Sequence, residues 1–244
     1  MQQEYARIFL LSHMRAYTSL LGHILGSHPQ INGYYEMHMS YLTTQDLSRQ
    51  QHLYSKEDIL KPNSQYLFDK LLHNDYLLEL DQLNPQNTVI LIALRKPKPT
   101  ITSIMELFNN KNTQHPYATA ELATQYYIER LIKLSTFSQQ NKQRYFYFDT
   151  ELISQDTEDF LATVSQWLQL KTTLTEEYQI FNKTGIAGAG DSSIEIKSGK
   201  IIRHHQKTYA ATLPDELATN AITTYNDCRK QLIENAISYI IASP

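Results

Sequence analysis

The sequence contains little that would suggest a disulfide scaffold, a zinc site or a membrane protein. Cys228 is the only cysteine, which excludes an internal disulfide, and no Cys/His cluster has the spacing of a zinc site. No stretch approaches the roughly 20 apolar residues of a membrane helix, and the N-terminus lacks the regions of a signal peptide. We therefore expect a cytoplasmic protein without a transmembrane segment.

Basic excess and glycine are also scarce. The net charge of -3 argues against a nucleic-acid partner, because proteins that bind nucleic acids usually carry a strong basic excess. Only seven residues are glycine, and four of them fall between Thr184 and Lys200. Long loops within compact domains are usually functional. We predict a single domain over residues 1–244, with a mobile glycine-containing loop at 184–210.

Short apolar segments alternate with helical patterns along most of the chain. The clearest is Thr88–Leu94 (TVILIAL), which is apolar throughout its centre, as a strand buried on both faces must be. The other predicted strands are 8–11, 31–35, 66–68 and 145–148. The predicted helices are 18–27, 74–83, 99–108, 118–140, 158–168 and 214–241. This alternation predicts a three-layer α/β fold whose central, mainly parallel sheet is flanked by helices; the polar segment 44–64 shows no clear pattern.

A first candidate anion site follows the first predicted strand and opens the first helix. Residues 12–21 read SHMRAYTSLL. A loop at this point directs backbone N–H groups and the positive end of the helix dipole toward one place, which suits a phosphate. Arg15 adds a cation with a fork of donors, and Thr18 and Ser19 add hydroxyls. From position alone, a phosphate site and a simple helix cap are equally good interpretations.

A second candidate anion site follows the clearest strand, where residues 95–103 read RKPKPTITS. Arg95 lies at the carboxyl end of the strand, and Ser103 lies about one turn into the next helix. Their spacing allows both side chains to close on one anion. Ligands of parallel sheets bind at the carboxyl ends of the strands, so the two candidate sites can serve one ligand.

Together, the two segments resemble the sulfotransferase family. RAYTSLL at 15–21 resembles P-R-S-G-[ST]-[ST]-L-L, the family's 5′-phosphosulfate loop, and Arg95 with Ser103 matches R-[DN]-P-x-x-x-x-x-S, which binds a 3′-phosphate. The resemblance covers most of residues 7–203. It implies a P-loop NTPase-like sulfotransferase fold, with 3′-phosphoadenosine 5′-phosphosulfate (PAPS) as donor substrate and no metal. The donor-binding residues that it implies are Arg15, Ala16, Tyr17, Thr18, Ser19, Arg95 and Ser103.

The first loop departs from the family pattern at two positions. Met14 replaces the usual proline, and Tyr17 replaces the usual glycine. If that glycine position needs a positive φ, a tyrosine there is strained. The loop then takes a variant shape, or the ring of Tyr17 stacks on a ligand.

Candidate catalytic residues follow the second and third predicted strands. Glu36 and His38 in GYYEMH resemble the family's G-E-x-H, in which the glutamate is a proposed base. His38 is the competing base, since a neutral imidazole near pH 7 also accepts a proton. Lys70 resembles a lysine of the family that stabilises charge or orients the acceptor. His73 is a further base candidate, one residue off the family's spacing, and it could instead cap the predicted helix 74–83.

These residues predict a sulfotransferase that moves a sulfuryl group to an acceptor hydroxyl by in-line transfer. One alternative is a P-loop-type small-molecule kinase, although the first loop lacks the glycine and lysine of G-x-x-x-x-G-K-[ST]. Another is a catalytically inactive, sulfotransferase-like binding module. The acceptor stays open among small molecules, saccharides, lipids and a protein tyrosine, and the sequence does not predict the oligomeric state.

Overall fold

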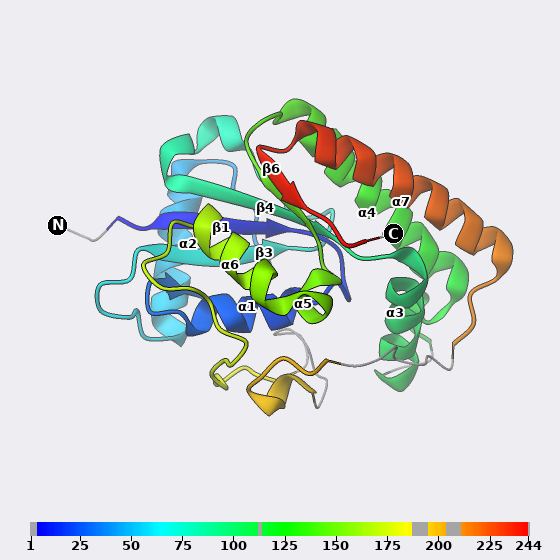
Figure 1. Ribbon diagram of the computed structural model, residues 1–244, viewed down its shortest axis with the longest axis horizontal. Helices are drawn as coiled ribbons and strands as arrows, with labels where there is room; N and C mark the ends of the chain where they lie inside the picture. Colours follow the sequence, from blue (N-terminus) through cyan, green and yellow to red (C-terminus); the bar gives the residue numbers. More distant parts are fainter. Residues whose placement is uncertain (1–3, 112–113, 187–194, 204–210, 244) are drawn as a thin grey trace.

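The computed structural model describes residues 4–111, 114–186, 195–203 and 211–243. Six strands form one sheet in the order β2-β3-β1-β4-β5-β6, and every pairing is parallel (Figure 1). The strands are β1 (Ala6–Leu11), β2 (Ile31–Asn32), β3 (Tyr66–Leu71), β4 (Thr88–Leu94), β5 (Phe146–Asp149) and β6 (Ser238–Ile240). The predicted central parallel sheet is therefore confirmed.

Helices cover both faces of the sheet. The helices are α1 (Thr18–Ser27), α2 (Thr44–Glu57), α3 (Pro97–Lys111), α4 (Ala120–Gln140), α5 (Leu152–Gln155), α6 (Thr157–Trp167) and α7 (Asp215–Asn235). In β4, Ile90 and Ile92 pack in one core with α3, α4 and α7, whereas Leu91 packs in a second core with α1, α5 and α6 (Figure 1). The three-layer α/β prediction is confirmed, and β4 is buried on both faces because it lies between these cores. None of the described helices combines the length and apolar character needed to cross a membrane.

The strand order brings the two predicted anion segments together. β1 lies between β3 and β4, so the chain that leaves β3 crosses β1 to reach β4. Ligands of open α/β sheets bind at the carboxyl ends of the strands where the order reverses. The loop after β1 and the connection from β4 to α3 meet at this point.

Two glycines bring α1 against the chain that leaves β2. An added Cβ would lie 2.5 Å from the Tyr34 carbonyl oxygen at Gly22, and 2.6 Å from the Gly33 carbonyl oxygen at Gly26. Because only glycine allows this approach, the pair fixes the start of the segment that carries Glu36.

The predicted helix 74–83 is wrong. This stretch holds only a 3-10 turn at Leu80–Gln82, and Leu78 forms an isolated parallel bridge with Tyr41. The Tyr41 N–H donates to the Leu77 carbonyl at 2.8 Å, so the backbone here is paired across the molecule instead of within a helix. Burial of Leu78, Leu80 and Leu83 in the core accompanies this pairing.

Three other segments also differ from expectation. Segment 44–64 contains α2, the predicted helix 214–241 ends at Asn235 before β6, and the strand predicted at 31–35 stops at Asn32. Gly33 follows β2 with φ 95°, a conformation that interrupts the strand. In the predicted loop 184–210, residues 195–198 form a 3-10 turn, whereas 187–194 and 204–210 lie outside the described residues.

Candidate active site

The loop after β1 contains two left-handed residues. Arg15 has φ 62°, and Tyr17, directly before α1, has φ 54° and ψ 16°. Tyr17 therefore adopts the backbone conformation that glycine takes most easily, at a cost of roughly 1–2 kcal/mol. Arg95 makes two contacts that offset this cost: Nη2 donates to the Tyr17 hydroxyl at 3.0 Å, and its guanidinium carbon lies 4.3 Å from the ring centroid.

Arg15, Arg95 and Ser103 converge on one another. Arg95 Nη1 donates to the Arg15 carbonyl oxygen at 2.9 Å, and Arg15 Nε donates to Ser103 Oγ, also at 2.9 Å. Ser103 and Arg95 are both largely buried. The two segments predicted to bind the 5′ and 3′ sides of a nucleotide thus contact each other at the ends of β1 and β4.

Lys70 reaches the start of α1 from β3. Its Nζ donates to Ser19 Oγ at 2.9 Å, and the side chain is only 1% exposed. This bond places the Lys70 ammonium next to the first loop. Thr18 is buried, and Ala16 has no exposed surface.

His13 joins the first loop to the end of β4. The fully buried ring donates from Nδ1 to the Met14 carbonyl at 2.9 Å, and Nε2 accepts the Arg95 backbone N–H at 3.1 Å. Burial lowers the pKa of His13 to about 3, so the ring is neutral at physiological pH. Both nitrogens are used within the protein, which gives His13 a structural role.

Arg130 on α4 was not predicted from the sequence, yet it ties the ends of two central strands together. Its guanidinium donates to the Ser12 carbonyl at 2.8 Å, the Leu71 carbonyl at 2.5 Å and Asn74 Oδ1 at 3.2 Å. Burial lowers its pKa to about 10. The sequence did contain one indication of this role. Arg130 is four residues from both Tyr126 and Leu134, so it lies on the same face of the helix as these two, where an arginine side chain needs buried hydrogen-bond acceptors.

The three candidate bases lie around one tyrosine. The rings of His38 and His73 have centroids 5.7 and 6.4 Å from that of Tyr76. Burial lowers the pKa of His73, and the nearby Glu36 carboxylate partly opposes that shift. Arg130 Nη1 donates to the His73 carbonyl at 3.3 Å, which places His73 beside the ends of β1 and β3. Because 74–83 is not a helix, His73 does not cap one.

The Glu36 carboxylate is poorly satisfied within the protein. The residue is 8% exposed, and Oε1 is buried without a hydrogen-bond partner among the described residues. His38 Nδ1 lies 3.8 Å from Oε1. A buried carboxylate oxygen normally accepts a hydrogen bond, and Oε1 accepts none from the described residues.

Asp69 holds the Glu36 segment against β3 and was also missed from the sequence. Its Oδ1 accepts the Met37 N–H at 3.0 Å, and its Oδ2 accepts the Tyr41 hydroxyl at 2.6 Å. Burial raises the pKa of Asp69 to about 7. Asp69 alternates with Lys70 along β3, so one side chain fixes the Glu36 segment while the next reaches the first loop.

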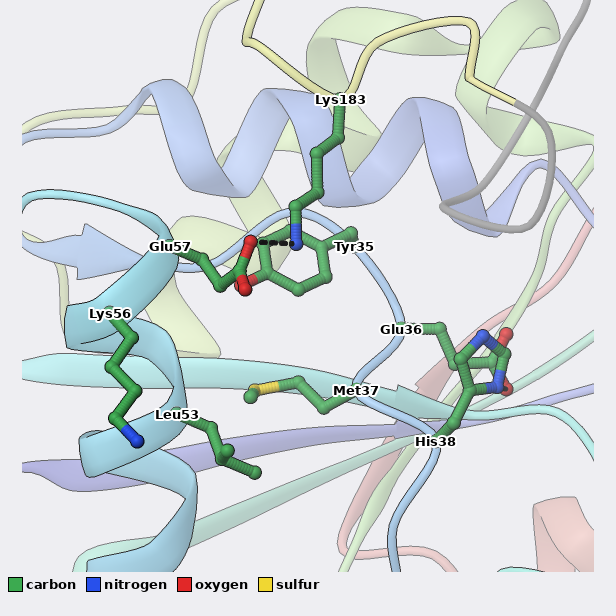
Figure 2. A pocket seen from close by; sticks show the side chains of 8 residues that line it. All are labelled: Tyr35, Glu36, Met37, His38, Leu53, Lys56, Glu57 and Lys183. Atoms are coloured by element: carbon green, nitrogen blue, oxygen red, sulfur yellow. Dashed lines mark ion pairs between the residues drawn. The ribbon is translucent and has the colours of Figure 1, made fainter.

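A cavity of about 300 Å³ opens beside Glu36. Its walls are the segment 35–38, three side chains of α2 and Lys183 (Figure 2). This volume lies at the lower limit for small-molecule sites.

Comparison with known proteins identifies the fold. No family profile and no curated protein sequence matches the chain. Among solved structures, the sulfotransferase domain from the curacin biosynthetic pathway is 15% identical, with a TM-score of 0.59 over 92% of this chain and 99% of that domain. The sulfotransferase domain from the Synechococcus PCC 7002 olefin synthase is also 15% identical, with a TM-score of 0.60 over 93% and 97%. The chain therefore has the fold of sulfotransferase domains.

Proposed function

We propose that the chain is a sulfotransferase that moves a sulfuryl group from PAPS to an acceptor hydroxyl. The observation that carries this proposal is the convergence of Arg15, Arg95 and Ser103 where β1 and β4 end. A donor with both 5′ and 3′ phosphates needs two neighbouring anion sites. The two motifs, which adjoin where β1 and β4 end, support this assignment.

In the proposed reaction, the acceptor oxygen attacks the sulfur of PAPS. A new oxygen–sulfur bond forms as the bond between sulfur and the bridging oxygen of the 5′-phosphosulfate breaks. The leaving group, 3′-phosphoadenosine 5′-phosphate (PAP), keeps the electron pair on that oxygen, and Glu36 takes the acceptor proton. Lys70, next to the first loop, offsets the charge that develops on the bridging oxygen.

The direct test is calorimetry with PAP. We expect binding at micromolar ligand, and Arg95→Ala weakens it by about 1.5–3 kcal/mol because charged hydrogen bonds to phosphate are lost. Folded wild-type protein that gives no heat with PAP contradicts the proposal. A loss below about 0.5 kcal/mol in Arg95→Ala removes Arg95 from the site.

The second candidate function is a binding module that does not catalyse transfer. The contacts of Arg95 with the Tyr17 hydroxyl and the Arg15 carbonyl favour it, because these atoms use N–H groups that a phosphate needs. This alternative predicts that PAP binds without transfer to any alcohol, or that PAP does not bind at all. A transfer assay with radiolabelled PAPS and a panel of alcohols distinguishes the two functions.

A further inference from the structure

The hydroxyl of Tyr126, on α4, joins the first loop to the end of β3. The Met14 N–H donates to this hydroxyl at 2.8 Å, and the hydroxyl donates in turn to the Leu72 carbonyl at 2.9 Å. A tyrosine hydroxyl can donate one hydrogen bond while it accepts another, so both bonds form together. Burial raises the pKa of Tyr126, so its hydroxyl keeps the proton that the second bond needs. One oxygen atom therefore connects two strand ends.

The loop beyond Met14 has a backbone that needs support. Arg15 and Tyr17 both have left-handed backbone conformations, with φ 62° and 54°. Such residues persist only where the surrounding structure holds them in place. The entry to this strained stretch is held on both sides of Met14, because Tyr126 accepts its N–H and His13 Nδ1 donates to its carbonyl at 2.9 Å.

The residue type at position 14 explains why this hydroxyl matters. The motif that the loop resembles has proline at this position, and proline brings a fixed φ and no N–H group. Met14 has a freer φ, and its N–H needs an acceptor within the protein. The hydroxyl of Tyr126 supplies that acceptor and restricts the backbone at the same point.

The neighbours of Tyr126 on α4 hold the strand ends on either side of this contact. The Tyr127 hydroxyl donates to the Arg95 carbonyl at 2.7 Å, and Arg130 Nε donates to the Ser12 carbonyl at 2.8 Å. Both of these carbonyls belong to residues that directly follow a strand. Tyr126 reaches further into the first loop than either neighbour, so its hydroxyl bears most directly on the shape of that loop.

We propose that Tyr126 is a positioning residue that fixes the first loop through the Met14 N–H and thereby holds Arg15 in place for the donor. Tyr126 acts through Met14, and Arg15 makes the contact with the nucleotide. This assignment rests on the proposed function, in which the first loop binds the 5′ side of PAPS. The hydrogen bond to Tyr126 takes over the role that a proline ring has at position 14 of the family motif.

The test compares Tyr126→Phe with a matched tyrosine variant by calorimetry with PAP and by urea denaturation. Tyr126→Phe keeps the ring, whose centroid lies 5.3 Å from that of Tyr117, and removes only the hydroxyl. The control is Tyr145→Phe, since the buried Tyr145 hydroxyl donates to the Leu232 carbonyl at 2.7 Å directly before β5, at the opposite end of the sheet. We expect both variants to lose stability, whereas only Tyr126→Phe lowers PAP affinity, by about tenfold.

A rescue variant tests the part played by the Met14 N–H. Met14→Pro removes that N–H, so Tyr126→Phe in the Met14→Pro background leaves no donor without an acceptor at this point. We expect Tyr126→Phe to lower PAP affinity by less than about threefold in that background. A loss as large as that in the wild-type background overturns the role of the Met14 N–H.

The comparison with Tyr145→Phe decides the proposal by itself. A folded Tyr126→Phe protein that binds PAP as tightly as the wild type, while losing stability like Tyr145→Phe, gives Tyr126 a purely structural role and overturns the proposal. Equal losses of PAP affinity in the two variants overturn it as well. Absence of PAP binding by the folded wild type instead contradicts the proposed function.

Discussion

The proposed donor side of the site, residues 13–19, 95 and 103, and the proposed acceptor side, residues 35–38 with the cavity, are held in different ways. On the donor side, side chains such as Arg95 and Ser103 already bond other parts of the protein. On the acceptor side, Glu36 keeps a buried oxygen that accepts no hydrogen bond from the described residues. Groups that only position a ligand can form hydrogen bonds within the protein between turnovers. A general base, in contrast, must remain free to accept a proton from its substrate. The two sides should therefore respond differently to substitution.

The largest expected effect separates the two sides through Glu36. Glu36→Gln should lower kcat roughly 100- to 10,000-fold, because it removes a general base while keeping the shape of the side chain. PAP affinity should be unchanged. The measurement is kcat for the best acceptor beside calorimetry with PAP, and His38→Gln and His73→Gln are the matched comparisons. If either histidine variant loses more activity than Glu36→Gln, the base is misassigned.

The next effect tests how Arg130 stabilises the strand ends beside the first loop. Arg130→Met should lower the free energy of unfolding by about 3 kcal/mol, because it leaves the Ser12 and Leu71 carbonyls without their buried donor. Urea denaturation measures this loss. Arg144→Met, which breaks a pair with the exposed Asp81, is the control and should change stability by less than about 1 kcal/mol. Equal losses of unfolding free energy in Arg130→Met and Arg144→Met would show that Arg130 does not stabilise the strand ends.

A third prediction uses pH to compare one buried group from each side. The pKa of His13 is lowered to about 3, so its contribution to stability is complete above pH 6.5 and is lost as the pH falls from there toward 3. The pKa of Asp69 is raised to about 7, so its contribution is complete below pH 3.8 and is lost as the pH rises from there toward 7. Between about pH 4 and 6.5 the two slopes oppose each other.

Asp69→Asn should remove one of these slopes. The stability of the variant should then rise with pH by up to about 1.4 kcal/mol per unit more than that of the wild type in this window. Urea denaturation at several pH values measures the difference. Parallel pH profiles for wild type and Asp69→Asn would mean that Asp69 titrates normally in the folded protein.

The smallest effect concerns Tyr17. Tyr17→Phe removes the hydroxyl that occupies Arg95 Nη2, while the ring and its left-handed backbone remain. A bound 3′-phosphate no longer competes with that hydroxyl, so PAP affinity should improve by about 0.5–1 kcal/mol in calorimetry. A loss of affinity would instead show that the hydroxyl itself contacts the nucleotide.

The sequence predicted much of the fold because the fold depends on local patterns. The continuous apolar run Thr88–Leu94 identified the central strand, and the segment of Arg95 and Ser103, singled out by its spacing, contacts Arg15 in the structure. Helix α2 was missed although Thr43 and Asp46 form a capping box at its start, a signal readable from the sequence. β6 was missed because its identity as a strand depends on pairing with β5.

The acceptor side was predicted less completely because it is assembled from distant residues. Glu36 and His38 were found from their resemblance to a motif. The Asp69–Met37 bond spans 32 positions, and Arg130 bonds the Ser12 carbonyl across 118. Lys183 reaches the cavity from a segment without any recognised pattern. Tertiary packing determines such contacts, and the local spacing of residues in the sequence does not predict them.

The measurement that tests the central claim most directly is a calorimetric cycle between Arg95 and the 3′-phosphate. Wild type and Arg95→Ala are each titrated with PAP and with adenosine 5′-phosphate, which lacks the 3′-phosphate. We expect Arg95→Ala to lose about 1.5–3 kcal/mol of binding free energy with PAP and less than about 0.5 kcal/mol with adenosine 5′-phosphate. Equal losses with both nucleotides would contradict the claim that Arg95 and the first loop form one site for a doubly phosphorylated donor.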